Sequence, residues 1–125
     1  ISVFNRKGLR FIRNEAGISN LTTFHCMYLN IFAADRADLL FAYLLTDVSR
    51  QIFNDNRREY GNGLEKFEPN DLNHSQVVDL DKVELIEEKE IIKTLNEYRD
   101  GVLSNKEEIS LLDELNDHFL TVLTK

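Results

Sequence analysis

The chain has 125 residues, of which 30% are charged and 42% hydrophobic, with five glycines and one proline. This is the length and composition of one ordered globular domain, and it excludes a disordered tail. The single cysteine, Cys26, excludes an internal disulfide and a multi-cysteine metal site, and no apolar run approaches the ~20 residues that span a membrane. Because no signal peptide opens the chain, we expect a cytoplasmic protein. The chain starts at Ile1 and its only methionine is Met27, so we expect a piece of a longer protein.

The net charge of −7 is divided unevenly along the chain. Residues 1–60 carry eight basic and six acidic side chains, whereas residues 80–125 carry six basic and twelve acidic ones. An acidic surface binds polyanions poorly, because neutralisation of phosphates supplies most non-specific affinity for nucleic acids. Only the first sixty residues could therefore form a basic face, and the acidic half is typical of solvated helical surfaces.

The first third of the chain has the composition of β-strands. Residues 1–4 and 9–13 mix β-branched, aromatic and basic side chains, with a turn signal at Lys7-Gly8 between them. Residues 21–31 are again rich in β-branched and aromatic residues. The turns are too short for crossover connections, so the pattern predicts a small antiparallel sheet.

The apolar period changes after Asp35. Leucine, valine and isoleucine then recur at helical spacing, which predicts one helix over residues 38–58 that packs on the sheet. The Tyr60–Gly63 segment ends this pattern, since glycine and asparagine accept a positive φ at little steric cost.

Two further helices are predicted in the acidic part. The first covers residues 81–99 with Gly101 as its cap, and the second opens at Ser104, which has capping-box spacing to Glu107. The second helix carries an apolar stripe of Leu112, Leu115, Phe119 and Val122. The predicted fold is therefore α+β: a small antiparallel sheet in the N-terminal third packed by one long helix, followed by a C-terminal helical hairpin. Its two parts are residues 1–79 and 80–125.

No catalytic constellation stands out in the sequence. His25, His74 and His118 lack a histidine or cysteine at metal-ligand spacing, so no metal site is predicted. We expect Cys26 to be a small buried apolar side chain. The five glycines do not form a phosphate-binding loop. The chain alone is not expected to be an enzyme.

The most informative segment begins at Tyr60 and reads Tyr-Gly-Asn-Gly-Leu-Glu-Lys-Phe-Glu-Pro. Its two glycines allow close approach of the backbone to another surface, and Lys66 places a cation beside the turn. Upstream, Arg13-Asn14 and residues 22–25 offer hydrogen-bonding side chains suited to contact with bases or phosphates.

This segment resembles the C-terminal region of adenine-N6 DNA methyltransferases from restriction–modification systems. These proteins often carry Tyr-Gly-Gly-Gly-Leu-x-Lys-x-Glu-Pro-x-x-Leu after a helix, and Asn62 replaces the middle glycine here. The family also tends to place a threonine and a histidine ahead of a similar helix, as Thr23 and His25 do. The resemblance covers about residues 9–80, and the matching residues of the motif are Tyr60, Gly61, Gly63, Leu64, Lys66, Glu68, Pro69 and Leu72.

The resemblance implies a target-recognition role on double-stranded DNA. The family flips an adenine out of the duplex, holds it in an Asn/Asp-Pro-Pro-Tyr/Phe loop and methylates it with S-adenosylmethionine. The only proline here is Pro69, so this loop and its catalytic domain are expected upstream of residue 1, with the cofactor. The residues expected to bind DNA are Arg10, Arg13, Asn14, Thr23 and His25, with Gly61, Gly63 and Lys66 on backbone phosphate.

The second hypothesis is a non-catalytic interaction module. In that case the helices of residues 81–125 pair with a partner or with a second copy of the chain through the apolar stripe. The same stripe could equally pack on the helix predicted at residues 38–58.

Overall fold

The computed structural model describes residues 4–5, 10–19, 24–54, 58–60, 64–66 and 69–125, with side chains for residues 10–19, 24–54 and 69–125. Within these residues the chain is mainly helical. In order, the elements are β1 (Phe4–Asn5), a 3₁₀ turn η1 (Ala34–Arg36), α1 (Ala37–Leu44), α2 (Asp47–Asn54), β2 (Arg58–Tyr60), β3 (Leu64–Lys66), α3 (Pro69–Asn73), a 3₁₀ turn η2 (Leu80–Lys82), α4 (Leu85–Leu103) and α5 (Ile109–Leu123).

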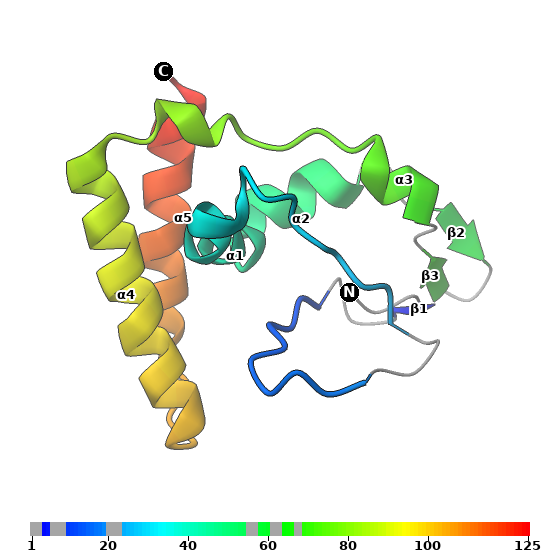
Figure 1. Cartoon of the computed structure of the whole chain (residues 1–125), viewed down its shortest axis with the longest axis horizontal. Helices are drawn as coiled ribbons and strands as arrows, with labels where there is room; N and C mark the ends of the chain where they lie inside the picture. Colours follow the sequence, from blue (N-terminus) through cyan, green and yellow to red (C-terminus); the bar gives the residue numbers. More distant parts are fainter. Residues whose placement is uncertain (1–3, 6–9, 20–23, 55–57, 61–63, 67–68) are drawn as a thin grey trace.

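The helices α4 and α5 lie side by side at one end of the molecule, and the short strands lie at the other (Figure 1). Helix α1 packs against both members of this pair, and α2 leads away from it toward the strands. The order of the strands is β1-β3-β2, and both pairings are antiparallel.

The predicted sheet of the N-terminal third is wrong. Of that third, the described residues contribute only the two-residue β1 to the sheet, and residues 10–19 and 24–30 run without helix or strand apart from an isolated bridge at Phe24. Strands β2 and β3 come after the helices, close to the glycine segment. The N-terminal third has strand-like composition, but strand propensity expresses a fit to a half-buried surface, and most of this segment is exposed.

The single helix predicted over residues 38–58 is also wrong, because it is broken between α1 and α2. The Thr46 Oγ1 accepts a hydrogen bond from the Ser49 backbone N–H at 3.3 Å, which is the geometry of an N-cap. The Ser49 hydroxyl donates to the Leu44 carbonyl at 3.0 Å and to the Thr46 carbonyl at 2.9 Å. These two buried hydroxyls satisfy backbone groups at the break, so α2 begins as a new helix.

A side chain from the C-terminal pair completes this break. The Val48 N–H at the start of α2 donates to Asn116 Oδ1 on α5 at 3.0 Å. The first N–H groups of any helix have no partner within the helix, so Asn116 supplies one of the missing acceptors. It thereby ties the direction of α2 to the position of α5.

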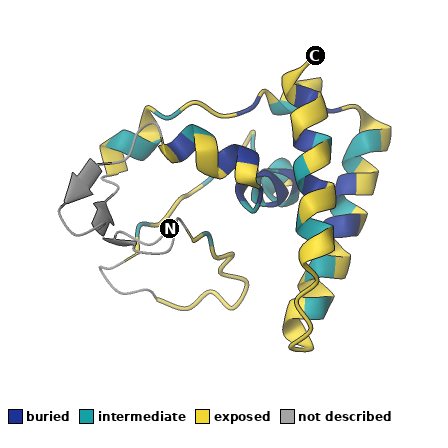
Figure 2. Cartoon of the chain, turned by 180° about the vertical axis from the view of Figure 1, so that it is seen from behind, coloured by how far each residue is buried: buried dark blue, intermediate teal, exposed yellow. Residues whose placement is uncertain are grey.

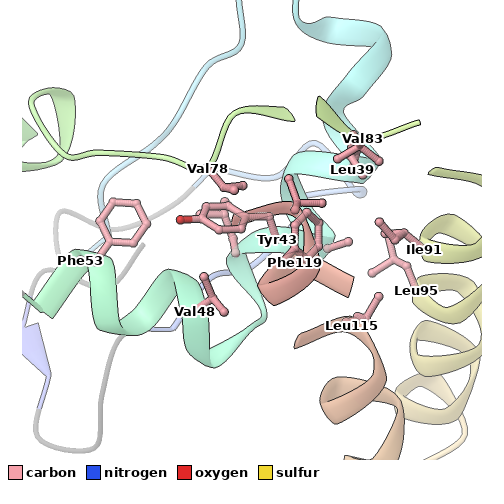
Figure 3. Close-up of a cluster of buried hydrophobic side chains, with 13 residues drawn as sticks. Leu39, Tyr43, Val48, Phe53, Val78, Val83, Ile91, Leu95, Leu115 and Phe119 are labelled. Carbon is pink, nitrogen blue, oxygen red and sulfur yellow. The ribbon is translucent and has the colours of Figure 1, made fainter. Parts of the chain in front are cut away.

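The hydrophobic core forms where α1 meets α4 and α5. The rings of Tyr43 and Phe119 meet edge to face with their centroids 5.4 Å apart (Figure 3). The predicted stripe of α5 lies in this cluster: Leu115, Phe119 and Val122 are buried and Leu112 is half-buried. The stripe therefore packs against the chain's own helices, with Leu39, Tyr43, Ile91 and Leu95 among its neighbours in the cluster.

The turn between α4 and α5 differs from the predicted caps. Helix α4 continues past Gly101 to Leu103, and Asn105 takes the left-handed conformation with a φ of 56°. The Lys106 N–H donates to the Gly101 carbonyl at 2.7 Å and the Asn105 N–H to the Val102 carbonyl at 3.1 Å, which is the Schellman pattern.

The predicted capping box at Ser104 does not form. Helix α5 begins only at Ile109, and the Glu107 carboxylate instead accepts a hydrogen bond from the Tyr98 hydroxyl at 2.7 Å. Burial, together with this hydrogen bond, raises the pKa of Tyr98 to about 12. Glu107 thus ties the turn to α4.

We predict that Gly101→Ala destabilises the chain. A Cβ at this position would lie 2.5 Å from the Lys106 carbonyl oxygen, so the backbone of the turn must shift. The expected loss is about 1–3 kcal/mol of unfolding free energy in urea denaturation, although alanine is the better helix former. Val102→Ala, one residue away and exposed, is the control and should stay within about 0.5 kcal/mol of wild type. Equal stability of the Gly101→Ala variant would contradict the close approach.

We also predict that Asn116→Ala lowers the unfolding free energy by about 1 kcal/mol, because the Val48 N–H loses its acceptor. Asn116→Asp is the matched variant, since it keeps a side-chain oxygen and adds a negative charge at a helix N-terminus. It should retain wild-type stability in the same denaturation experiment. A similar loss in both variants would show that the acceptor is not what matters.

Candidate nucleic-acid interface

The residues predicted to bind DNA lie largely on an extended N-terminal segment. We call its described residues, 10–19 and 24–33, the arm. Almost all of the arm is exposed, as the yellow trace in Figure 2 shows. The half-buried Phe11 is the exception near its start, and its ring packs against Phe53 of α2 with centroids 5.7 Å apart.

Polar contacts hold the arm against the helices. The Arg13 guanidinium donates to the Asp38 carboxylate on α1. The Asn14 side chain closes a local turn, because its Nδ2 donates to the Ile18 carbonyl at 2.7 Å and its Oδ1 accepts from the Ile18 N–H at 3.2 Å. Gly17 completes that turn with a φ of 63°, which favours glycine.

A bidentate ion pair between Arg99 and Glu15 connects this turn to α4. Arg99 donates from Nε to Glu15 Oε1 at 3.0 Å and from Nη2 to Glu15 Oε2 at 2.6 Å. The Arg99 hydrogen bond, with weaker help from the Arg13 charge, lowers the pKa of the Glu15 carboxyl. The pair is exposed, so it positions the arm more than it stabilises the fold.

The structure leaves the predicted site residues in different situations. Arg10 is exposed, whereas Arg13 and Asn14 are engaged in the contacts just described. His25 is half-buried. Lys66 is the last residue of the central strand β3. Thr23, Gly61 and Gly63 lie outside the described residues.

The strand register adds a basic residue, Arg58, to those predicted from the sequence. Arg58 on β2 pairs with Lys66 on β3, and Glu59 pairs with Glu65 at the next position. Two basic residues therefore occupy opposing register positions of adjacent strands, next to a position where two acidic residues oppose each other. The signal was available, because Arg58 and Lys66 are equally distant from Asn62 in the sequence.

Charge separates the two ends of the molecule. Residues 10–54 contain four basic and four acidic side chains, whereas residues 69–125 contain six basic and fourteen acidic ones. A polyanion is therefore repelled by the end formed by α4 and α5. Residues 10–54 therefore form the less acidic part of the chain.

The expectation of a buried Cys26 is wrong, because this residue is exposed on the arm. Its side chain is hydrogen-bonded with the Tyr28 hydroxyl, and this contact raises the pKa of Tyr28. A cysteine is often buried because it behaves as a small apolar side chain, but the arm provides no core to receive it.

The described residues include a hollow lined by apolar and charged side chains. One hollow of about 290 Å³ is found beside Phe32, and its Arg36 guanidinium is already bonded to Asp81 at 2.8 Å and to the Leu80 carbonyl at 2.9 Å. No glycine lines it to let backbone approach a ligand. Within the described residues, no group of three or more potential ligands is arranged to hold a metal, and no helix is long and apolar enough to cross a membrane.

Comparison with known proteins defines the class. Residues 1–120 match the family described as the C-terminal domain of the Type II methyltransferase M.Eco57I. The chain therefore belongs to this family, and the resemblance to the C-terminal region of restriction–modification DNA methyltransferases is confirmed.

A curated relative is similar to this chain and is considerably longer. The Type II methyltransferase M.AccI of Acinetobacter calcoaceticus is 51% identical over 123 residues, which are 97% of this chain. They are only 23% of the relative, so the chain spans about a quarter of the relative's length. No solved structure matches the chain at a significant level.

We predict that Arg99→Ala raises the pKa of Glu15 toward its ordinary value. The folded-state pKa is lowered by Arg99, so the ion pair is present above the ordinary carboxyl pKa and is lost as the pH falls through the lowered one. The measurement is an NMR titration of the Glu15 carboxyl in both proteins. Lys93→Ala, an exposed lysine on the same helix, is the control and should leave the titration unchanged. A Glu15 titration that ignores Arg99→Ala would contradict the ion pair.

Proposed function

We propose that this chain is the DNA-facing C-terminal part of a cytoplasmic methyltransferase that modifies adenine at N6 in a restriction–modification system. The observation that carries the proposal is the family match over residues 1–120, since an enzyme of this class must hold duplex DNA while it modifies one base. In this proposal the catalytic part precedes the chain and binds S-adenosylmethionine, which supplies the methyl group.

The charge distribution and the strand register support the place of the interface. The duplex would meet the arm and the strands, because the α4–α5 end is acidic. At the strands, Arg58 and Lys66 share a register position, and in this proposal they supply the cations for phosphate contacts. The proposed DNA-binding residues remain Arg10, Arg13, Asn14, Thr23, His25, Gly61, Gly63 and Lys66, to which we add Arg58.

Contacts within the chain divide these residues into two roles. Arg13 and Asn14 shape the arm through Asp38 and Ile18, so their replacement would disturb the arm as well as any DNA contact. Arg10 is exposed on the same segment and is the better probe of direct contact. Base contacts from such a segment would select the sequence, and phosphate contacts would fix its register on the duplex.

The apolar stripe named for the alternative of a helical interaction module is not available to a partner. That alternative rested on the stripe of α5, and Leu115, Phe119 and Val122 are buried in the chain's own core. The acidic pair of helices instead supports the arm through Arg99 and the start of α2 through Asn116.

The DNA contact is tested with Arg10→Ala, Arg58→Ala and Lys66→Ala in the full methyltransferase. Removal of one phosphate-binding cation should weaken duplex binding and reduce the slope of log affinity against log salt by about 1. Lys89→Ala, an exposed lysine on α4, is the matched control and should change neither quantity. Wild-type affinity and slope in all three variants would overturn the proposed interface.

The reaction is tested separately from the binding. Plasmid DNA modified by the wild-type methyltransferase is digested to nucleosides and analysed by mass spectrometry. The expected product is N6-methyladenine. Methylcytosine in its place would refute the adenine assignment while leaving the family membership intact.

A further inference from the structure

Several large apolar side chains of the arm face solvent. The exposed fraction is 88% for Tyr28, 82% for Ile31, 89% for Phe32 and 46% for Met27. We call these four residues the apolar patch. Scattered single apolar residues on a surface are ordinary, but a cluster within six consecutive positions indicates an interaction site.

The patch is held in place rather than loosely extended. Asn30 Oδ1 accepts hydrogen bonds from the Phe32 N–H at 3.1 Å and the Ala33 N–H at 3.0 Å, and the Asn30 carbonyl accepts from the Ala33 N–H at 3.1 Å. Ile31 and Phe32 are the two central residues of this turn, where glycine, proline and asparagine are usual. A fixed turn that presents isoleucine and phenylalanine outward is pre-organised for binding.

A hollow of about 290 Å³ adjoins the patch. Phe32 lines one side of it, with Leu40 and Val78 contributing apolar surface and Asp79 and Asp81 contributing carboxylates. Protein interfaces commonly seat a central anchor side chain in such a depression, surrounded by apolar contacts that exclude water. The patch and the hollow adjoin each other at Phe32.

Charge favours protein over nucleic acid as the occupant of the patch. Residues 26–34, which include the whole patch, contain no aspartate, glutamate, lysine or arginine. A DNA-binding surface is rich in positive charge, whereas the centre of a protein interface is depleted of charge and enriched in aromatic residues and methionine. The apolar patch therefore has the chemistry of a protein interface.

The relative contains a large amount of protein beyond the segment that this chain matches. This chain corresponds to 23% of the Type II methyltransferase M.AccI and to a family described as a C-terminal domain. We propose that the apolar patch and its hollow dock against the catalytic part that precedes this chain in the same polypeptide. The inference rests on that element of the proposed function, and it leaves Arg10 and the strands facing DNA.

The test places a photo-crosslinking benzoylphenylalanine at Phe32 in the full methyltransferase, and irradiates it with and without duplex DNA. We expect cross-links to residues preceding this chain, in both conditions, mapped by mass spectrometry. The same group at Leu103, which is 69% exposed in the turn region between α4 and α5, is the control and should give none. Cross-links from Phe32 to DNA, to a second copy, or only within this chain would overturn the proposal.

A second measurement covers the case in which the bulky probe disturbs the surface. Tyr28→Ser with Phe32→Ser should separate the thermal unfolding of the full methyltransferase into two transitions, because the two parts lose their shared interface. Leu103→Ser with Ile109→Ser removes similar exposed apolar surface and should keep the wild-type profile. An unchanged profile in the patch variant counts against docking. Neither experiment measures DNA affinity. A failure of the docking proposal can therefore be distinguished from a failure of the proposed DNA interface.

Discussion

The break between α1 and α2 determines where the remaining elements can lie. Thr46 and Ser49 are almost fully buried and direct their hydroxyls to backbone groups at the break, while Asn116 of α5 accepts from the first turn of α2. If the helix continued without the break, Val48 and Phe53 would lie along the axis of α1, which crosses α4 and α5. Because the chain turns instead, α2 carries Phe53 to the place where Phe11 of the arm packs.

Sequence periodicity predicted the helices of the acidic half far better than the rest of the fold. An apolar stripe with a 3.6-residue period predicts the core-facing surface of a helix, and the stripe of α5 is indeed buried. The sequence did not predict the helix break at Thr46, because the apolar period continues through it. The groups that stabilise the break are buried hydroxyls, which leave no mark on that period. The sheet failed for another reason: β1 pairs with β3, some sixty residues later, and no local pattern encodes so distant a partner.

Part of the candidate site could also be predicted from the sequence. The glycine segment led to the right family, because a motif depends on residue identity and spacing rather than on long-range packing. Arg58 was not predicted because its pairing with Lys66 appears in the sequence only as an equal spacing from Asn62, and such spacing does not by itself indicate a strand register. Arg13 was chosen for its charge, yet Asp38 already engages it. Its partner is distant in the chain, so only the folded structure distinguishes a supporting arginine from one that faces a ligand.

The hydrophobic cluster is shared between the two halves of the chain, with Leu39 and Tyr43 on α1 packed among Ile91, Leu115 and Phe119 of α4 and α5. A recombination event that exchanged only the DNA-facing half between related methyltransferases would pair mismatched core surfaces. New specificities made by such exchange should therefore be inherited as the whole segment from the arm to α5. Under the proposed function, the acidic helices would be inherited together with the DNA-facing half because they complete its core.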